Sequence, residues 1–134
     1  MTSVYVVDDS ELLLERVIAL IADSPELTFK GQSDCYEGTT QKIQAIKPDV
    51  VILDIRLGDG SGIDLLQELK KHEDCPKIIM FTNFAIPQYK DRCLEFGADY
   101  FLDKSTGSRE LARTLQNIAE QAESEKIQQG VTHD

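Results

Sequence analysis

The chain has 134 residues, of which 41% are hydrophobic, and this combination is typical of one folded domain with a packed core. The formal net charge of -10 argues against binding to nucleic acid or to an anionic membrane, because both need a basic surface. The longest apolar run, at residues 17–22, is far shorter than the roughly 18 residues of a membrane span, and the first residues lack the basic segment of a signal peptide. The 3 cysteines are widely spaced and form no Cys-x-x-Cys pair, so we expect reduced thiols in a cytoplasmic protein.

Short β-rich runs alternate with segments of helical periodicity along most of the sequence. The β-rich runs predict strands at residues 3–8, 27–33, 50–54, 77–82 and 99–103. The intervening segments predict helices at residues 11–24, 36–47, 62–72, 87–97 and 108–122. Ser10 is suited to cap the first helix, and Pro48 should end the second. Pro87 and Gly97 are suited to the first turn and the end of the fourth helix.

Successive strand–helix units predict an α/β fold with one parallel, doubly wound, five-stranded sheet covered by five helices on its two faces. We expect residues 1–122 to form this single domain, with the GDGSG segment at residues 58–62 as the turn into the third helix. Residues 123–134 have no apolar periodicity after Ile127, and we expect them to form a short, frayed tail.

Polar residues lie at or just after the ends of four predicted strands, on the edge of the sheet where open α/β folds bind ligands. The first strand ends in Asp8 and is followed by Asp9, the third ends in Asp54, the fourth ends in Thr82, and Lys104 follows the fifth. Crowded carboxylates repel one another unless a cation neutralises them, and Mg2+ is a hard, oxygen-binding cation that suits such a group. A metal, an ammonium and a hydroxyl around one carboxylate predict a phosphoryl-transfer site with Asp54 as the nucleophile.

Taken singly, these residues have simpler structural explanations. An aspartate often caps a helix or forms a turn, a threonine favours strands, and a lysine is usually a solvated charge. Phe101 is explained most simply as a core or half-buried strand aromatic. The convergence of three carboxylates on one edge is what favours a functional site.

The chain resembles the receiver domain of response regulators in two-component signalling, over about residues 3–122. The matching features are Asp8-Asp9, Asp54 with the GDGSG loop, Thr82, the FGADYF segment and Lys104. The resemblance implies the strand order 2-1-3-4-5 and phosphorylation of Asp54.

The resemblance also implies roles for the residues around the phosphoacceptor. Mg2+ is bound by Asp9, Asp54 and the main-chain carbonyl of Arg56, with Asp8 acting largely through water. Thr82 and Lys104 bind the phosphoryl oxygens. Phe101 matches the aromatic residue whose ring turns inward when the threonine is drawn to the phosphate.

The implied function is a signalling switch rather than an enzyme, although it promotes its own phosphorylation and dephosphorylation. A sensor histidine kinase or a phosphotransfer protein donates the phosphoryl group, and a downstream protein effector binds the face made by the fourth helix, the fifth strand and the fifth helix. We expect no direct binding of nucleic acid or membrane. We favour a stand-alone receiver over a fragment of a longer regulator.

Three further residues should control access to the phosphoryl group: Arg56, Asn83 and Phe84. Arg56 and Phe84 should shield the group from water and slow its loss, whereas Asn83 could crowd the entrance or position a water. Lys104 is followed by Ser105, where many receivers have a cis-proline, so the geometry of this bond is open.

Two other functions compete with this interpretation. A Mg2+-dependent phosphohydrolase would also form an aspartyl-phosphate, but the dehalogenase-like phosphatases have a second aspartate at the position of Arg56. A flavodoxin-like cofactor binder would need Ser, Thr and Gly in the loop after the first strand, which here reads DDSE.

Overall fold

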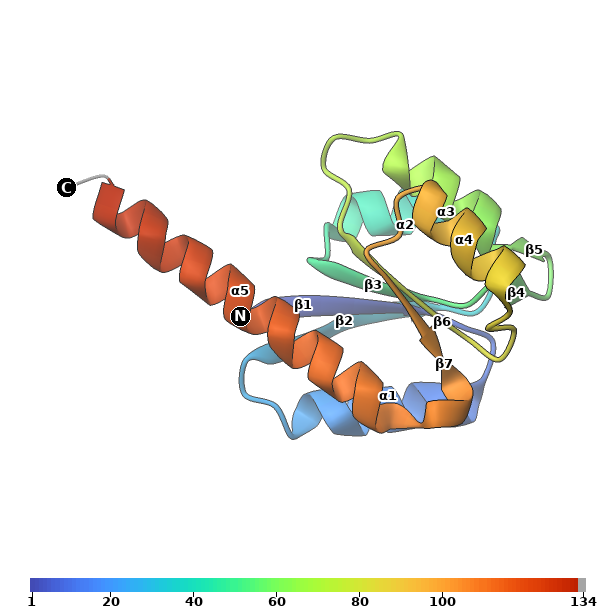
Figure 1. Ribbon diagram of the computed structural model, residues 1–134, viewed down its shortest axis with the longest axis horizontal. Helices are drawn as coiled ribbons and strands as arrows, with labels where there is room; N and C mark the ends of the chain where they lie inside the picture. The colour runs from blue at the N-terminus through green and yellow to red at the C-terminus, as the bar shows by residue number, and fades with distance from the viewer. Residues whose placement is uncertain (133–134) are drawn as a thin grey trace.

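Five parallel strands form one sheet with the order β2-β1-β3-β6-β7 in the structure, a computed structural model that describes residues 1–132 (Figure 1). These strands are β1 (Thr2–Val7), β2 (Leu27–Ser33), β3 (Val50–Leu53), β6 (Lys77–Thr82) and β7 (Tyr100–Asp103). The order equals 2-1-3-4-5 when only the strands of this sheet are counted, so the implied topology is confirmed.

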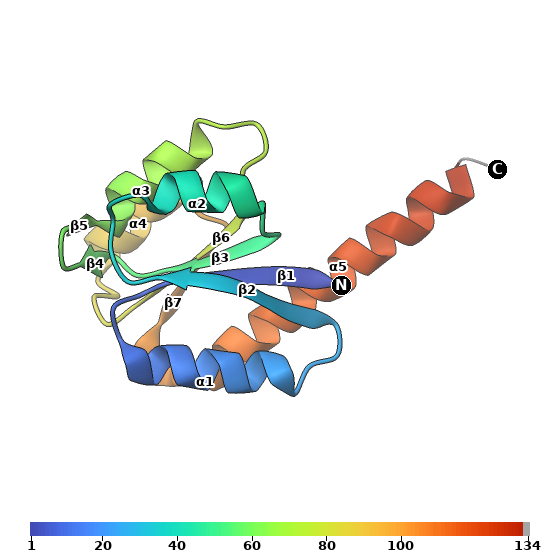
Figure 2. The same ribbon diagram turned by 180° about the vertical axis from the view of Figure 1, so that it is seen from behind.

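Helices cover both faces of the sheet, as the alternating sequence pattern predicts (Figures 1 and 2). One face carries α1 (Glu11–Ala22) and α5 (Ser108–Thr132), and the other carries α2 (Thr39–Ile46), α3 (Gly62–Lys70) and α4 (Pro87–Glu95). Alternate residues of the central strands enter two hydrophobic clusters, one under each helical layer. All four residues of β3 are buried, which explains why this strand is a continuous apolar run rather than an alternating one.

The residues predicted to begin or end helices occupy those positions in the structure. The Ser10 side chain accepts a hydrogen bond from the main-chain N–H of Leu13, 3.2 Å away, and caps α1. Pro87 is the first residue of α4. Gly97 follows this helix with φ +101°, a left-handed conformation that favours glycine.

The C-terminal segment differs from the sequence-based expectation. Helix α5 continues to Thr132, so most of the segment predicted as a frayed tail is helical; residues 133–134 lie outside the described residues. The apolar periodicity does end, but residues 120–129 are mostly Glu, Gln, Ala and Lys, which favour a helix by intrinsic propensity. Figure 1 shows this part of the helix extending beyond the sheet. The domain limit at residue 122 remains a prediction.

The GDGSG segment leads into α3, with Ser61 as its N-cap, but it also forms part of a hairpin that the sequence analysis did not predict. Strands β4 (Arg56–Leu57) and β5 (Gly60–Ser61) pair in an antiparallel hairpin with Gly58 and Asp59 at its tip. A two-residue Gly-Asp loop is a known hairpin signal. Between residues 1 and 132 there is no cis peptide bond, so Lys104–Ser105 is trans. Within the same range no helix has the length and apolar character needed to cross a bilayer.

Candidate phosphoryl-transfer site

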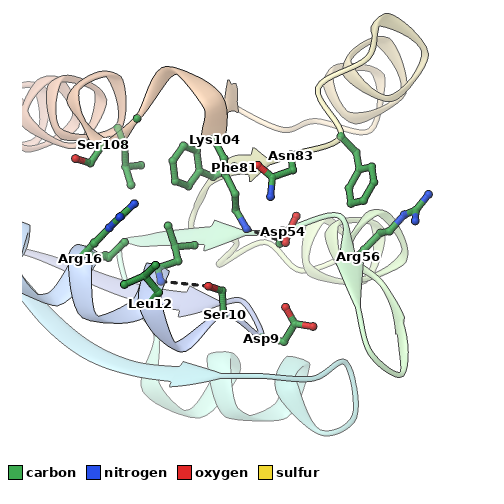
Figure 3. A pocket seen from close by; sticks show the side chains of 15 residues that line it. Asp9, Ser10, Leu12, Arg16, Asp54, Arg56, Phe81, Asn83, Lys104 and Ser108 are labelled. Atoms are coloured by element: carbon green, nitrogen blue, oxygen red, sulfur yellow. Dashed lines mark hydrogen bonds and ion pairs between the residues drawn. The ribbon is translucent and has the colours of Figure 1, made fainter.

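The strands β1, β3, β6 and β7 end at one edge of the sheet, here called the carboxyl edge (Figure 3). Asp8, Asp54 and Thr82 lie there with relative exposures of 5%, 7% and 0%. Two buried carboxylates beside a buried hydroxyl are unusual in a protein interior, where charged groups are paired or neutralised. The structure therefore brings together the residues that the sequence places at successive strand ends.

Lys104 is the cation that pairs with the two buried carboxylates. Its Nζ lies 2.7 Å from Oδ2 of Asp8 and 3.0 Å from Oδ2 of Asp54. Figure 3 shows the Lys104 side chain pointing into the cavity toward Asp54. One ammonium thus bridges carboxylates that come from β1 and β3, whereas Lys104 itself follows β7.

Burial and the pairing with Lys104 act in opposite directions on the pKa values of this group. It raises the pKa of Asp8 above its ordinary value, against the opposing effect of hydrogen bonds from Lys104 and from the N–H of Ser10. Burial also acts to lower the pKa of Lys104, but the hydrogen bonds and charges of Asp8 and Asp54 outweigh it and the pKa is raised. Lys104 therefore stays charged at neutral pH, and the carboxylates compete for it.

Asp9 completes an acidic group with a composition that fits a divalent cation. Carboxylate oxygens of Asp8, Asp9 and Asp54 lie within 4.8 Å of one another, and Asp9 is exposed. Three carboxylates facing one ammonium leave an excess of negative charge. Hard oxygen donors at this spacing, with one side open to solvent, suit Mg2+, which keeps several of its waters.

The main chain around Asp54 is held by short contacts. The carboxylate Oδ1 accepts a hydrogen bond from the N–H of Ile55, 2.7 Å away. The N–H of Gly62 donates to the carbonyl of Ile55 at 2.6 Å. A Cβ placed on Gly62 would lie 1.8 Å from the carbonyl oxygen of Asp54, so only glycine allows the chain to pass there. Sequence reasoning missed Gly62, although its place at the end of the glycine-rich segment was a signal.

The residues predicted to control access lie along one side of the same cavity. The guanidinium carbon of Arg56 lies 3.9 Å from the centroid of the Phe84 ring, an arrangement typical of a cation–π contact. Thr82 Oγ1 accepts a hydrogen bond from the N–H of Phe84 at 3.0 Å. Asn83 is exposed and lines the cavity. Phe101 is partly buried and packs against the cluster under α2, α3 and α4.

The cavity has a volume of about 460 Å³ and continues from the carboxylates along α1 toward the start of α5. Leu12 and Arg16 of α1 line this extension, and Leu12 is largely exposed (Figure 3). Neither residue was singled out from the sequence, because both fit the ordinary pattern of an amphipathic helix. A partner that reaches Asp54 through this opening would contact them.

The fold and the site define an α/β domain with an acidic, lysine-paired carboxylate at the switch point of a doubly wound sheet. Residues 4–116 match the model of the response regulator receiver domain family, and the chain belongs to this family. It is therefore a receiver domain of two-component signalling.

Relatives and solved structures agree with this assignment. The chain is 31% identical over 125 residues to the sensory transduction protein LytT of Bacillus anthracis, which covers 93% of this chain and 50% of the relative. It is 36% identical over 122 residues to an uncharacterized response regulatory protein of Vibrio cholerae, covering 90% of this chain and 50% of the relative. The chain thus spans about half the length of these relatives. The response regulator domain of Thermotoga maritima CheB superposes with a TM-score of 0.79 at 26% identity, covering 91% of this chain and 96% of that one.

Proposed function

We propose that this receiver accepts a phosphoryl group on Asp54 from a sensor histidine kinase or a phosphotransfer protein, in a reaction that needs Mg2+. The observation that carries the proposal is the position of the Asp54 carboxylate at the cavity, 3.0 Å from Lys104 Nζ and beside two further acids. A carboxylate oxygen attacks phosphorus, and the new O–P bond forms as the N–P bond of the phosphohistidine breaks. The imidazole leaves with the electron pair.

Lys104 and Thr82 are the side chains that we expect to bind the phosphoryl oxygens. The Lys104 ammonium already lies against Asp54, and charge-assisted hydrogen bonds to a phosphoryl group are strong. A hydroxyl can accept and donate at once, so Thr82 can donate to the phosphoryl group while it accepts from the N–H of Phe84.

The acidic residues are proposed to hold the metal. When bound, Mg2+ neutralises the charge that builds up on the transferred group. The residues that would hold it are Asp8, Asp9, Asp54 and the main-chain carbonyl of Arg56. The spacing of the three carboxylates supports this set.

Phosphorylation is proposed to change a surface that binds a downstream effector protein. Movement of Thr82 toward the phosphoryl group vacates space that the Phe101 ring can enter, which biases the face made by α4, β7 and α5. Phe101 and Thr82 lie on the adjacent, paired strands β7 and β6, which supports this coupling. The acidic surface and the free cysteines support a cytoplasmic location without direct nucleic acid binding.

Arg56 and Phe84 are proposed to protect the phosphorylated state. Water must approach phosphorus in line with the O–P bond, and the contact between these two side chains supports a cover over that approach. Phe84 offers no group that could orient a water, and Arg56 can pair with phosphoryl oxygens. Exposed Asn83 lies on the same side of the cavity, where it can either crowd the approach or orient a water. We therefore propose a slowly dephosphorylating receiver.

Intact-mass measurement after incubation with acetyl phosphate tests the proposed function. The wild-type protein should gain one phosphoryl mass in Mg2+ and none in EDTA. Asp54→Ala should gain none, whereas the matched control Asp99→Asn, at the far edge of the sheet, should be labelled like the wild type. Equal labelling of Asp54→Ala would refute Asp54 as the phosphoacceptor.

A further inference from the structure

The β4–β5 hairpin begins two residues after Asp54, and its tip is hydrogen-bonded to the loop between β2 and α2. At this tip, Asp59 Oδ1 accepts a hydrogen bond from the N–H of Tyr36 at 2.6 Å, and Oδ2 accepts one from the N–H of Glu37 at 3.0 Å. One carboxylate thereby binds two successive main-chain donors in the loop between β2 and α2. These bonds lower the pKa of Asp59, so the carboxylate is charged at neutral pH.

The Tyr36 side chain extends this contact to helix α3. A Cβ placed on Gly60 would lie 3.0 Å from Cβ and Cγ of Tyr36, so the tyrosine packs directly on the hairpin main chain. Its hydroxyl donates to a carboxylate oxygen of Glu68, and the other oxygen accepts from Thr40 Oγ1 at 2.7 Å. We call Asp59, Tyr36 and Glu68 the hairpin clamp.

The base of the hairpin is joined to the phosphoacceptor. Gly62, directly after β5, donates to the carbonyl of Ile55 and leaves no room for a side chain against the carbonyl of Asp54. Arg56 pairs with Ser61 across the hairpin. These contacts connect the hairpin to the main chain of residues 54–56.

We propose that the hairpin clamp is a positioning element for metal binding, which holds the Arg56 carbonyl and the Asp54 main chain where Mg2+ requires them. The inference rests on the proposed function, because it takes the Arg56 carbonyl and the Asp54 carboxylate as metal ligands. Mg2+ demands nearly ideal octahedral geometry, so small shifts of one ligand weaken binding. Mutation of residues that orient metal ligands without touching the metal typically lowers the affinity for the metal by about 10- to 100-fold.

The test is a titration of the metal-free protein with Mg2+ alone, followed by the amide resonances of Asp9 and Ile55. Asp59→Ala should raise the dissociation constant for Mg2+ about tenfold. Asp59→Asn, which keeps one side-chain oxygen, should give a smaller increase. The matched control is Asp49→Ala: Asp49 accepts hydrogen bonds from the N–H and Oγ of Ser3 at 2.8 and 3.1 Å, at the edge farthest from the metal ligands. Its Mg2+ affinity should stay within twofold of the wild type.

Labelling by acetyl phosphate gives a second readout that a general loss of stability would not produce. Asp59→Ala should need more Mg2+ for half-maximal labelling, while its rate at saturating Mg2+ stays within twofold of the wild type. If Asp59→Ala does not fold, Tyr36→Phe, which keeps the packing on Gly60 but removes the bond to Glu68, should shift the Mg2+ requirement in the same direction.

The outcomes separate the two proposals. A wild-type protein that binds no Mg2+ overturns the metal site and this inference with it. A wild-type protein that binds Mg2+, with Asp59→Ala and Asp49→Ala of equal affinity, overturns the hairpin clamp alone.

Discussion

The two ends of the sheet use the same residue types in different ways. At the edge where the strands begin, here called the amino edge, Asp99 Oδ2 accepts from the N–H of Ile78 at 2.8 Å and from Lys70 Nζ at 3.3 Å. Asp49 accepts from the N–H of Ser3. Each of these carboxylates precedes one strand and ties it to its neighbour.

At the carboxyl edge Asp8 and Asp54 are buried, whereas Asp49 and Asp99 at the amino edge are exposed. Asp8 and Asp54 share the ammonium of Lys104, and exposed Asp9 adds further negative charge. Repulsion between these carboxylates and their burial away from water both destabilise the folded state. The comparison teaches that a shared counter-ion and burial, rather than residue type, distinguish the carboxylates of the proposed site from those that only tie strands together.

The largest expected effect comes from removing Lys104 at the carboxyl edge, compared with removing Lys77 at the amino edge. Lys104→Met leaves two buried carboxylates without a counter-charge and should lower the free energy of unfolding by about 3 kcal/mol in EDTA at pH 7. Lys77→Met removes a cation that is 55% exposed and 4.0 Å from Asp99, and should change the free energy by less than about 0.5 kcal/mol. Urea unfolding measures the free energy of unfolding of both variants. Equal losses would contradict the proposed difference between the two edges.

Removing a carboxylate should have opposite effects at the two edges. Asp99→Ala removes the acceptor of the Ile78 N–H and should destabilise the protein by about 1–2 kcal/mol. Asp54→Asn keeps an oxygen for the N–H of Ile55 and relieves repulsion, so its free energy of unfolding should equal or exceed that of the wild type. A loss in Asp54→Asn as large as in Asp99→Ala would contradict the distinction.

The carboxyl edge also carries the Arg56–Phe84 contact that we propose as a cover over the phosphoryl group. Replacing Arg56 with Asn and Phe84 with Glu together should open the approach of water and speed loss of the phosphoryl group by about tenfold or more, equal to about 1.4 kcal/mol of barrier. The decay of phosphorylated protein after removal of the donor measures this rate. Decay at the wild-type rate or more slowly would show that the two residues do not shield the group.

The smallest expected effect is a pH dependence of stability that arises at the hairpin tip. There Asp59 accepts hydrogen bonds from main-chain N–H groups, as the amino-edge carboxylates do. Its pKa is lowered in the folded state, so its contribution to stability is present above about pH 4 and is lost as the pH falls through the folded pKa. The advantage of the wild type over Asp59→Asn in free energy of unfolding should therefore shrink between pH 6 and pH 3. A constant difference over this range would show that the charge of Asp59 does not contribute.

Much of the fold follows from the sequence because its signals are local. The apolar run before Asp54 defines the central strand, and the cap at Ser10 and the proline at Pro87 define where helices begin. The residues of the carboxyl edge could be predicted to lie together because parallel strands end at the same edge of a sheet.

The remaining features depend on contacts between distant segments. Tyr36 and Glu68 are ordinary residues until the fold brings them into hydrogen-bond contact beside the hairpin. Residues 123–127 of α5 are exposed, so this part of the helix depends on helix propensity, which apolar periodicity does not detect. The stacking of Arg56 on Phe84 joins strand β4 to the loop after β6, two segments that are distant in the sequence.

The most direct test of the contrast between the two edges is the change in amide chemical shifts when beryllofluoride and Mg2+ are added. Large shifts are predicted around Asp54, Thr82 and Lys104, extending through Phe101 to the face of α4, β7 and α5. The amides of Ser3 and residues next to Asp49 and Asp99 should be unchanged. Shifts confined to the loop around Asp54 would contradict the coupling to a partner surface, and shifts of equal size at both edges would contradict the separation of functional from structural carboxylates.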